Sequence, residues 1–127
     1  MRNLIFFLSL LYITTVNSQI WNIEWQQCYG GSDGDGAYGL EVLPNKNIIV
    51  FSSTSSTDGD ISFNHGSDDF WLIETDTSGN IIWEKTYGGS SSEYSEKMIK
   101  SVDHGYVMFG MTFSNDEIGR ASCRERV

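Results

Sequence analysis

Short apolar runs separated by turn residues fill the chain after its first eighteen residues. The runs read IIVF, FWLI and IIW, and they directly follow Asn47, Asp69 and Asn80, which are residue types common in turns. This pattern predicts β-strands, and no segment after residue 18 repeats its apolar residues with helical spacing. We expect four strands in one unit of sequence: Tyr38–Leu43, Asn47–Thr54, Asp69–Asp76, and Asn80 to Tyr87 or Gly88.

The connections predict antiparallel pairing. PNKN and DTSGN are short enough for hairpins, and Asn45 and Asn47 are residue types that tolerate the positive φ of a tight turn. Ser55–Asp68, in contrast, is a long polar connection. Because the strands carry continuous apolar runs, both faces of the sheet must be covered. Without helices, that cover would be neighbouring sheets of the same kind, as in the blades of a β-propeller.

An internal repeat supports that architecture. NIEWQQCYGGS from Asn22 aligns without a gap with NIIWEKTYGGS from Asn80, and Trp25 falls on Trp83, an offset of 58 in residue number. The same offset pairs further apolar, turn and acidic positions, namely Leu40 with Met98, Ile48 with Tyr106, Val50 with Met108, Phe51 with Phe109, Thr54 with Thr112, and Asp58 with Asp116. A fixed offset held over this much sequence is typical of repeat folds.

We therefore expect an all-β fold of four-stranded antiparallel blades, truncated after about one and a half blades of a β-propeller. Residues 19–32 would be the closing strand of a last blade, since Asn22–Tyr29 aligns with a fourth strand and has no first three strands ahead of it. Residues 33–90 would form one complete blade and residues 91–116 half of the next.

The N-terminus, MRNLIFFLSLLYITTVNS, has the form of a secretory signal peptide. A cation at Arg2 precedes a ten-residue run from Leu4 to Ile13, and Val16 and Ser18 are placed for cleavage before Gln19. A retained anchor is the alternative, but a membrane-spanning helix needs roughly 20 apolar residues. We expect residues 1–18 to be removed and the product to be secreted or held at the outer cell surface, without membrane insertion.

The tail IGRASCRERV, Ile118–Val127, departs from the rest. The repeat predicts Gly at 117 and Asp at 118, where the chain has Glu117 and Ile118. The tail resembles the in-frame translation of a widely used sequencing adapter, whose junction with one native base also gives Glu117. We interpret residues 117–127 as non-native; an arginine-rich targeting or nucleic-acid segment is the alternative.

The net charge limits which binding partners the protein can have, and the cysteines allow at most one disulfide. The net charge of −9 argues against nucleic acid and anionic membranes, which would repel the protein. Cys28 and Cys123 could form a disulfide in an exported protein, but Cys28 is unpaired if the tail is foreign. Cys28 aligns with Thr86, so the repeat indicates a small side chain there rather than a reactive thiolate.

Two acidic stretches are the candidate site. SDGDG contains Asp33 and Asp35, and TDGDISFNHGSDD contains Asp58, Asp60, Asn64, Asp68 and Asp69. Oxygen ligands around glycine are typical of calcium loops, but neither stretch has EF-hand spacing, and Asp and Gly are ordinary turn residues. We favour the turn interpretation and assign no metal ligand and no cofactor; calcium binding by the Asp33/Asp35 or Asp58/Asp60 loops stays open.

The sequence evidence for other catalytic or binding sites is weaker. His65 and His104 belong to no metal or triad pattern, and no G-x-S-x-G elbow accompanies the serines, so no catalytic residue is assigned. The tryptophans could stack on sugars, but the repetition of Trp25 and Trp83 favours packing within blades; Trp21 has no tryptophan counterpart, and Trp71 lies in an apolar strand.

The pattern W-x-x-x-Y-G-G-S, then S-x-x-x-D-G-D-I-S-x-N-H-G, then D-F-W-L-I-x-T-D-x-x-G-N-I-I-W resembles the bacterial secreted β-propeller repeat proteins often called SBBP-type. The resemblance spans Asn22–Asp116. It implies tandem blades in secreted or surface proteins, frequently delivered by type IX secretion with a C-terminal sorting domain, and it carries no catalytic residue.

We therefore expect a non-enzymatic binding or scaffold module whose partners are an unknown surface protein or glycan and the remaining blades of the same chain. The alternatives are a calcium-dependent carbohydrate-binding adhesin and an accessory propeller of an enzyme whose catalytic domain is missing. Neither the ligand nor the number of blades follows from the sequence.

Overall fold

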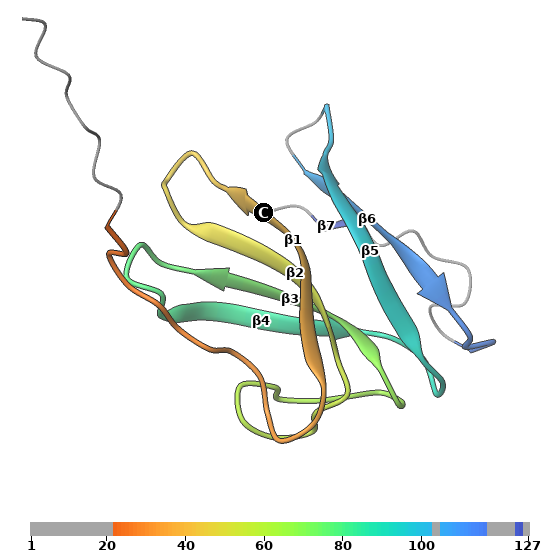
Figure 1. The fold of residues 1–127 in the computed structure, drawn as a ribbon. Coiled ribbons are helices and arrows are strands. Elements are labelled where there is room, and N and C mark those ends of the chain that lie inside the picture. Colours follow the sequence, from red (N-terminus) through yellow and green to blue (C-terminus); the bar gives the residue numbers. More distant parts are fainter. Residues whose placement is uncertain (1–21, 103–104, 117–123, 126–127) are drawn as a thin grey trace, which may run out of the picture.

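The computed structural model describes residues 22–102, 105–116 and 124–125. This part of the chain contains strands and no helix (Figure 1). The strands are β1 (Asp35–Val42), β2 (Ile48–Thr54), β3 (Asp69–Thr75), β4 (Ile81–Tyr87), β5 (Glu93–Lys100), β6 (Tyr106–Thr112) and β7 (Arg124–Glu125). The predicted all-β, antiparallel class is confirmed, and the four strands expected for the first unit lie within three residues of their expected ends.

The strands form two sheets. The first sheet has the order β1-β2-β3-β4 and the second the order β5-β6-β7, with antiparallel pairing throughout. β5 and β6 begin at the positions that the sequence repeat aligns with the first residues of β1 and β2, and they have the same lengths. The register break between Ala37 and Gly39 in β1 recurs between Ser95 and Lys97 in β5.

The β1–β2 hairpin is the short turn expected from PNKN, with its positive φ at the residue between the two asparagines. The positive φ belongs to Lys46, at 72°, and not to Asn45 or Asn47. The backbone N–H groups of Leu43 and Lys46 close the loop on Asn47 O and Leu43 O, both at 2.8 Å. Asn45 serves instead through its side chain, whose Oδ1 accepts from the N–H of Asn47 at 3.1 Å. The turn therefore uses the asparagine as an acceptor and not as its left-handed residue.

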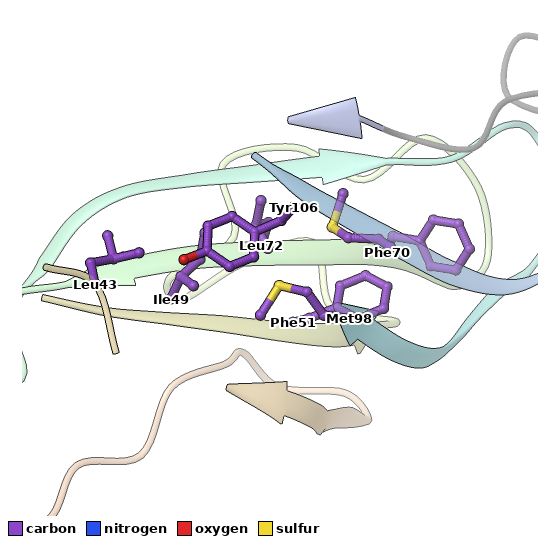
Figure 2. Close-up of a cluster of buried hydrophobic side chains, with 8 residues drawn as sticks. Leu43, Ile49, Phe51, Phe70, Leu72, Met98 and Tyr106 are labelled. Atoms are coloured by element: carbon purple, nitrogen blue, oxygen red, sulfur yellow. The ribbon is translucent and has the colours of Figure 1, made fainter. Parts of the chain in front are cut away.

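The core lies between the two sheets. It contains Leu43, Ile49, Phe51, Phe70, Leu72, Met98, Tyr106 and Met108 (Figure 2). Trp83 and Tyr87 pack against this cluster. Two buried hydrogen bonds cross the same interface, from Ser95 N to Ser53 Oγ at 2.7 Å and from Ser95 Oγ to Ser52 O at 2.6 Å. Apolar burial and satisfied polar groups thus fix how the sheets dock.

The opposite face of the first sheet is covered differently from our expectation. Trp71 and Ile73 alternate with the core residues of β3, and they pack with Ile61 and Tyr29, which come from connecting segments and not from a third sheet. The IIW run of β4 is only half-buried, and Ile82 is 51% exposed. This follows from topology, because β4 is an edge strand and β3 is the one buried along its whole length.

Residues 22–32, the described part of the expected closing strand 19–32, belong to neither sheet. Tyr29 Oη donates to Gly79 O at 2.6 Å, and Trp25 lies beside Gly79 in the β3–β4 turn. Trp83, by contrast, is in β4 and donates from Nε1 to Glu74 Oε2 at 2.6 Å. The two tryptophans do not occupy equivalent places here, because a strand needs a neighbouring strand for its backbone hydrogen bonds.

Little of the tail is described. Arg124 and Glu125 pair with Val107 and Tyr106 at the edge of β6. The rest of the presumed non-native segment, like the expected signal peptide, lies outside the described residues.

Phe51 and Phe109 give a matched test of the core. They are equivalent positions in the repeat, but Phe51 is 0% exposed whereas Phe109 is 46% exposed. Phe51→Ala should lower the free energy of unfolding by about 3 kcal/mol or more, because it leaves a cavity, and Phe109→Ala by less than about 1 kcal/mol. Urea denaturation of the full chain at low protein concentration would measure both. Equal losses would contradict this packing.

Candidate functional site

The candidate acidic residues gather at one end of the first sheet. β1 begins there with Asp35, β2 ends there with Thr54, and β3 begins there with Asp69. The loops before β1 and between β2 and β3 meet at this end (Figure 1). The antiparallel topology thus brings together the SDGDG and TDGDISFNHGSDD stretches, which are separated in sequence.

Asp35 organises this end from within β1. Its Oδ2 accepts from Gly31 N at 2.8 Å and from Ser56 Oγ at 3.0 Å, and its Oδ1 accepts from Thr54 Oγ1 at 2.5 Å. The carboxylate therefore ties the loop before β1 to the end of β2. Charge-assisted hydrogen bonds of this kind are stronger than neutral ones.

The neighbouring N–H groups of the loop are bound in the same way. Asp60 Oδ2 accepts from Gly30 N at 3.0 Å, and Asp58 Oδ1 accepts from Ser32 N at 2.8 Å. Asp33 enters through its backbone N–H, which donates to Ser56 Oγ at 3.0 Å. All four consecutive N–H groups from residue 30 to residue 33 thus have side-chain acceptors. We call this arrangement the amide clasp.

A second amide clasp lies at the positions that the repeat aligns with the first. Gly89 N donates to Glu93 Oε2 at 3.0 Å, Ser90 N to Asp116 Oδ1 at 3.1 Å, and Ser91 N to Ser114 Oγ at 3.0 Å. Thr112 Oγ1 donates to Glu93 Oε1 at 2.6 Å, as Thr54 does to Asp35. Glutamate replaces aspartate at one position, and three of the four N–H donors keep the aligned acceptors. The residue that aligns with Asp60 lies outside the described residues.

The clasps account for most of the acidic candidates. Within the described ranges, no three His, Cys, Asp or Glu side chains are grouped so that they could hold a metal ion. Asp35, Asp58 and Asp60 instead direct carboxylate oxygens at backbone N–H groups. The arrangement is that of a structural turn, in which the carboxylates take the place of missing backbone partners.

Asn64 and Asp68 stabilise the long connection between β2 and β3. Asn64 Nδ2 donates to Thr54 O at 3.3 Å and to Ser56 O at 3.2 Å. Asp68 Oδ1 accepts from Ser55 Oγ at 2.5 Å, and this hydrogen bond lowers the pKa of Asp68. The backbone of Asp68 reaches the second sheet, because Asp68 O accepts from Glu93 N at 2.6 Å.

Asp69 and Glu93 form a buried acidic pair where the two sheets meet. Both residues are 0% exposed, and Asp69 Oδ1 has no hydrogen-bond partner among the described residues. A Cβ on Gly88 would collide with Asp69 Oδ1 and with Glu93 Oε2, so both carboxylates press against one glycine. Burial raises the pKa of Asp69, and the charge of Glu93 raises it further.

His65 is the third member of this cluster, and sequence reasoning missed its role. Its backbone N donates to Asp69 Oδ2 at 2.7 Å, and its ring Nδ1 lies 2.7 Å from the same oxygen. The only sequence cue was the spacing H-x-x-x-D. The buried carboxylate of Asp69 orients the His65 ring, and the His65 side chain remains 28% exposed.

A shallow depression of about 220 Å³ lies beside His65. Phe63, His65, Gly89, Ser90 and Asp116 line it. Phe63 contacts the His65 ring edge-on, with ring centroids 4.8 Å apart. The backbone of Ser90 and the carboxylate of Asp116 are already bonded to each other in the second clasp.

The remaining candidates divide between packing and exposure. Trp71 is 1% exposed and donates from Nε1 to Glu84 Oε2 at 2.9 Å, which agrees with a packing role for it. Trp25 is 36% exposed, and Cys28 is exposed and forms no disulfide with any described residue. Trp21, His104 and Cys123 lie outside the described residues.

Comparison with protein-family models, with curated proteins and with solved structures finds no match to this chain. Nor does the described part of the chain contain a helix of the length and apolarity that crossing a membrane would require.

Asp35 and Asp33 test the first clasp as a matched pair. Asp35→Ala removes an acceptor of three hydrogen bonds and should lower the free energy of unfolding by about 2 kcal/mol. Asp33→Ala removes an equal charge from an exposed side chain and should change it by less than about 0.5 kcal/mol. Denaturant titration of both variants provides the comparison, and a similar loss in each would argue against the clasp.

The pKa shifts of Asp68 and Asp69 predict opposite pH dependences for the stability of variants at these two positions. Because the pKa of Asp69 is raised in the folded state, the protonated form of Asp69 stabilises the fold and its ionisation opposes folding. This stabilising contribution is present in acid and is lost as pH rises through the folded pKa. Asp69→Asn should therefore gain stability relative to the parent chain as pH rises from about 3 to 7.

Asp68→Asn should do the reverse. The lowered pKa of Asp68 contributes stability above its unfolded pKa, and this contribution is lost as pH falls through the folded value. The deficit of Asp68→Asn should thus be present at neutral pH and disappear in acid. Chemical denaturation over the same pH series measures both variants. Parallel pH profiles for the two would refute the assignment.

Proposed function

We propose that this chain belongs to a secreted or cell-surface β-propeller repeat protein that acts as a non-enzymatic binding or scaffold module. In this proposal the first sheet is a complete four-stranded blade, and β5 and β6 are the first two strands of the next. The strands are antiparallel, as blades require.

The recurrence of the amide clasp carries this proposal. The hydrogen bonds of Asp35, Thr54 and Ser56 reappear at the repeat-aligned residues Glu93, Thr112 and Ser114. The register break of β1 also reappears in β5. Two segments with the same register and the same loop bonds support one repeated structural unit.

The surface supports binding or scaffolding better than catalysis. The carboxylates of Asp35, Asp58 and Asp60 are engaged with backbone N–H groups, and Trp71 is buried. The net charge of −9 favours partners other than nucleic acid. The partner in this proposal is a surface protein or glycan, together with further blades of the same kind.

Export provides the first test. The full chain, expressed in a Gram-negative host, should be recovered outside the cytoplasm with Gln19 as its first residue, because the N-terminal segment has the form of a signal peptide. Intact mass measurement identifies the mature N-terminus. Recovery in the cytoplasm with residues 1–18 attached would contradict the proposed localisation.

Binding measurements with calcium and with glycans distinguish a scaffold from a calcium-dependent adhesin. Calorimetric titration of the same chain with calcium should give no binding heat, because the acidic side chains of the first clasp already accept hydrogen bonds. A calcium-dependent signal on a glycan array would instead favour the carbohydrate-binding alternative.

A further inference from the structure

The second sheet buries one of its faces against the first sheet. Met98, Tyr106 and Met108 on that face are 9%, 2% and 3% exposed. The repeat aligns them with Leu40, Ile48 and Val50, on the corresponding face of the first sheet. That face has no sheet against it in the described chain: Leu40 is 66% exposed, and Ile48 and Val50 are half-buried.

The opposite face of each sheet shows the reverse pattern of exposure. Ile49 and Phe51, which receive the second sheet, are both 0% exposed. Their repeat-aligned counterparts are Val107 and Phe109; Val107 is half-buried, and Phe109 is 46% exposed. Met111, two residues further along β6, is 50% exposed. The second sheet therefore presents outward the apolar positions that the first sheet uses inward.

Each sheet thus has two distinct apolar faces. We call the face with Leu40, Ile48 and Val50, or Met98, Tyr106 and Met108, the leading face. The face with Ile49 and Phe51, or Val107 and Phe109, is the trailing face. Within the molecule the leading face of the second sheet packs on the trailing face of the first. The trailing face of the second sheet is left over, and so is the part of the first sheet's leading face over β1 and β2. Tyr29 and Ile61 cover the part of that leading face at Trp71 and Ile73.

We propose that a second copy of this chain occupies these surfaces, with the trailing face of one molecule packed on the leading face of the next. This inference rests on the proposed function, because it treats repeat-aligned residues as equivalent. The internal interface already demonstrates that the two faces fit when they belong to successive sheets. The contact is heterologous, so both surfaces of a molecule can be used at once.

The surroundings of the leading face suit this occupant. A depression of about 210 Å³ lies beside it, lined in part by Val50, Ser52, Trp71 and Tyr29. Aromatic side chains such as Phe109 bury a large apolar area in such a place. The net charge of −9 makes two copies repel one another, so salt should promote the association by screening.

Two variants, one on each face, test whether the contact runs from the trailing face of one molecule to the leading face of the next. Phe109→Asp places a charge on the trailing face, and Leu40→Asp places one on the leading face. In sedimentation velocity the full chain should associate with rising concentration, and each variant alone should show at least about tenfold weaker association. Mixed in equal amounts, the variants should form a 1:1 dimer that grows no further, because each retains one intact face.

The control is Thr77→Asp, which adds the same charge in the exposed β3–β4 turn and should associate like the parent chain. Far-UV circular dichroism verifies that each variant is folded. If an aspartate variant loses its strand signal, threonine at the same position replaces it, since threonine suits a strand.

Several outcomes would overturn the proposal. They are a parent chain that stays monomeric, a mixture of the two variants that does not dimerise, and variants that associate as strongly as the parent through sheet edges. If only Phe109→Asp is monomeric, the contact is symmetric and not head to tail. Failure of export or a calcium-dependent glycan signal would count against the proposed function and leave this result unaffected.

Discussion

The complete burial of β3 is the constraint on which the rest of the structure depends. All seven residues of Asp69–Thr75 are buried, so this strand needs a hydrogen-bonded neighbour on each edge and apolar cover on each face. β2 and β4 supply the edges. The second sheet covers one face, and Tyr29 and Ile61 cover the other.

The same constraint produces the polar chemistry at the end of the sheet. A strand buried up to its first residue brings Asp69 into the interior, where it meets Glu93 of the second sheet beside Gly88. His65 provides the nearest compensation, through two contacts with Asp69 Oδ2. A buried carboxylate that has one oxygen without a partner among the described residues destabilises the fold. This destabilisation arises where the two sheets dock.

Local patterns predicted the strands well, because apolar runs bounded by turn residues depend on interactions between near neighbours in sequence. Features that depend on distant residues could not be predicted in this way. One of them is the cover of the face with Trp71 and Ile73, which Tyr29 and Ile61 provide in place of another sheet. The exposure of Ile82 depends on which strand ends up at an edge. The pairing of His65 with Asp69, and of both with Glu93, requires the packing of two sheets and has no reliable sequence signal.

The amide clasps have a consequence for how such a sequence can drift. A Cβ on Gly31 would collide with Asp58 Oδ1 and the Ser56 side chain, and one on Gly89 with Asp116 Oδ1 and the Ser114 side chain. Apolar strand positions tolerate exchanges of similar volume, as the replacement of Leu40 by Met98 in the second sheet illustrates. The glycines have no substitute that leaves the carboxylates in place. Divergent copies of this unit should therefore remain recognisable by their glycine, serine and acidic loop positions after their strands have lost all resemblance.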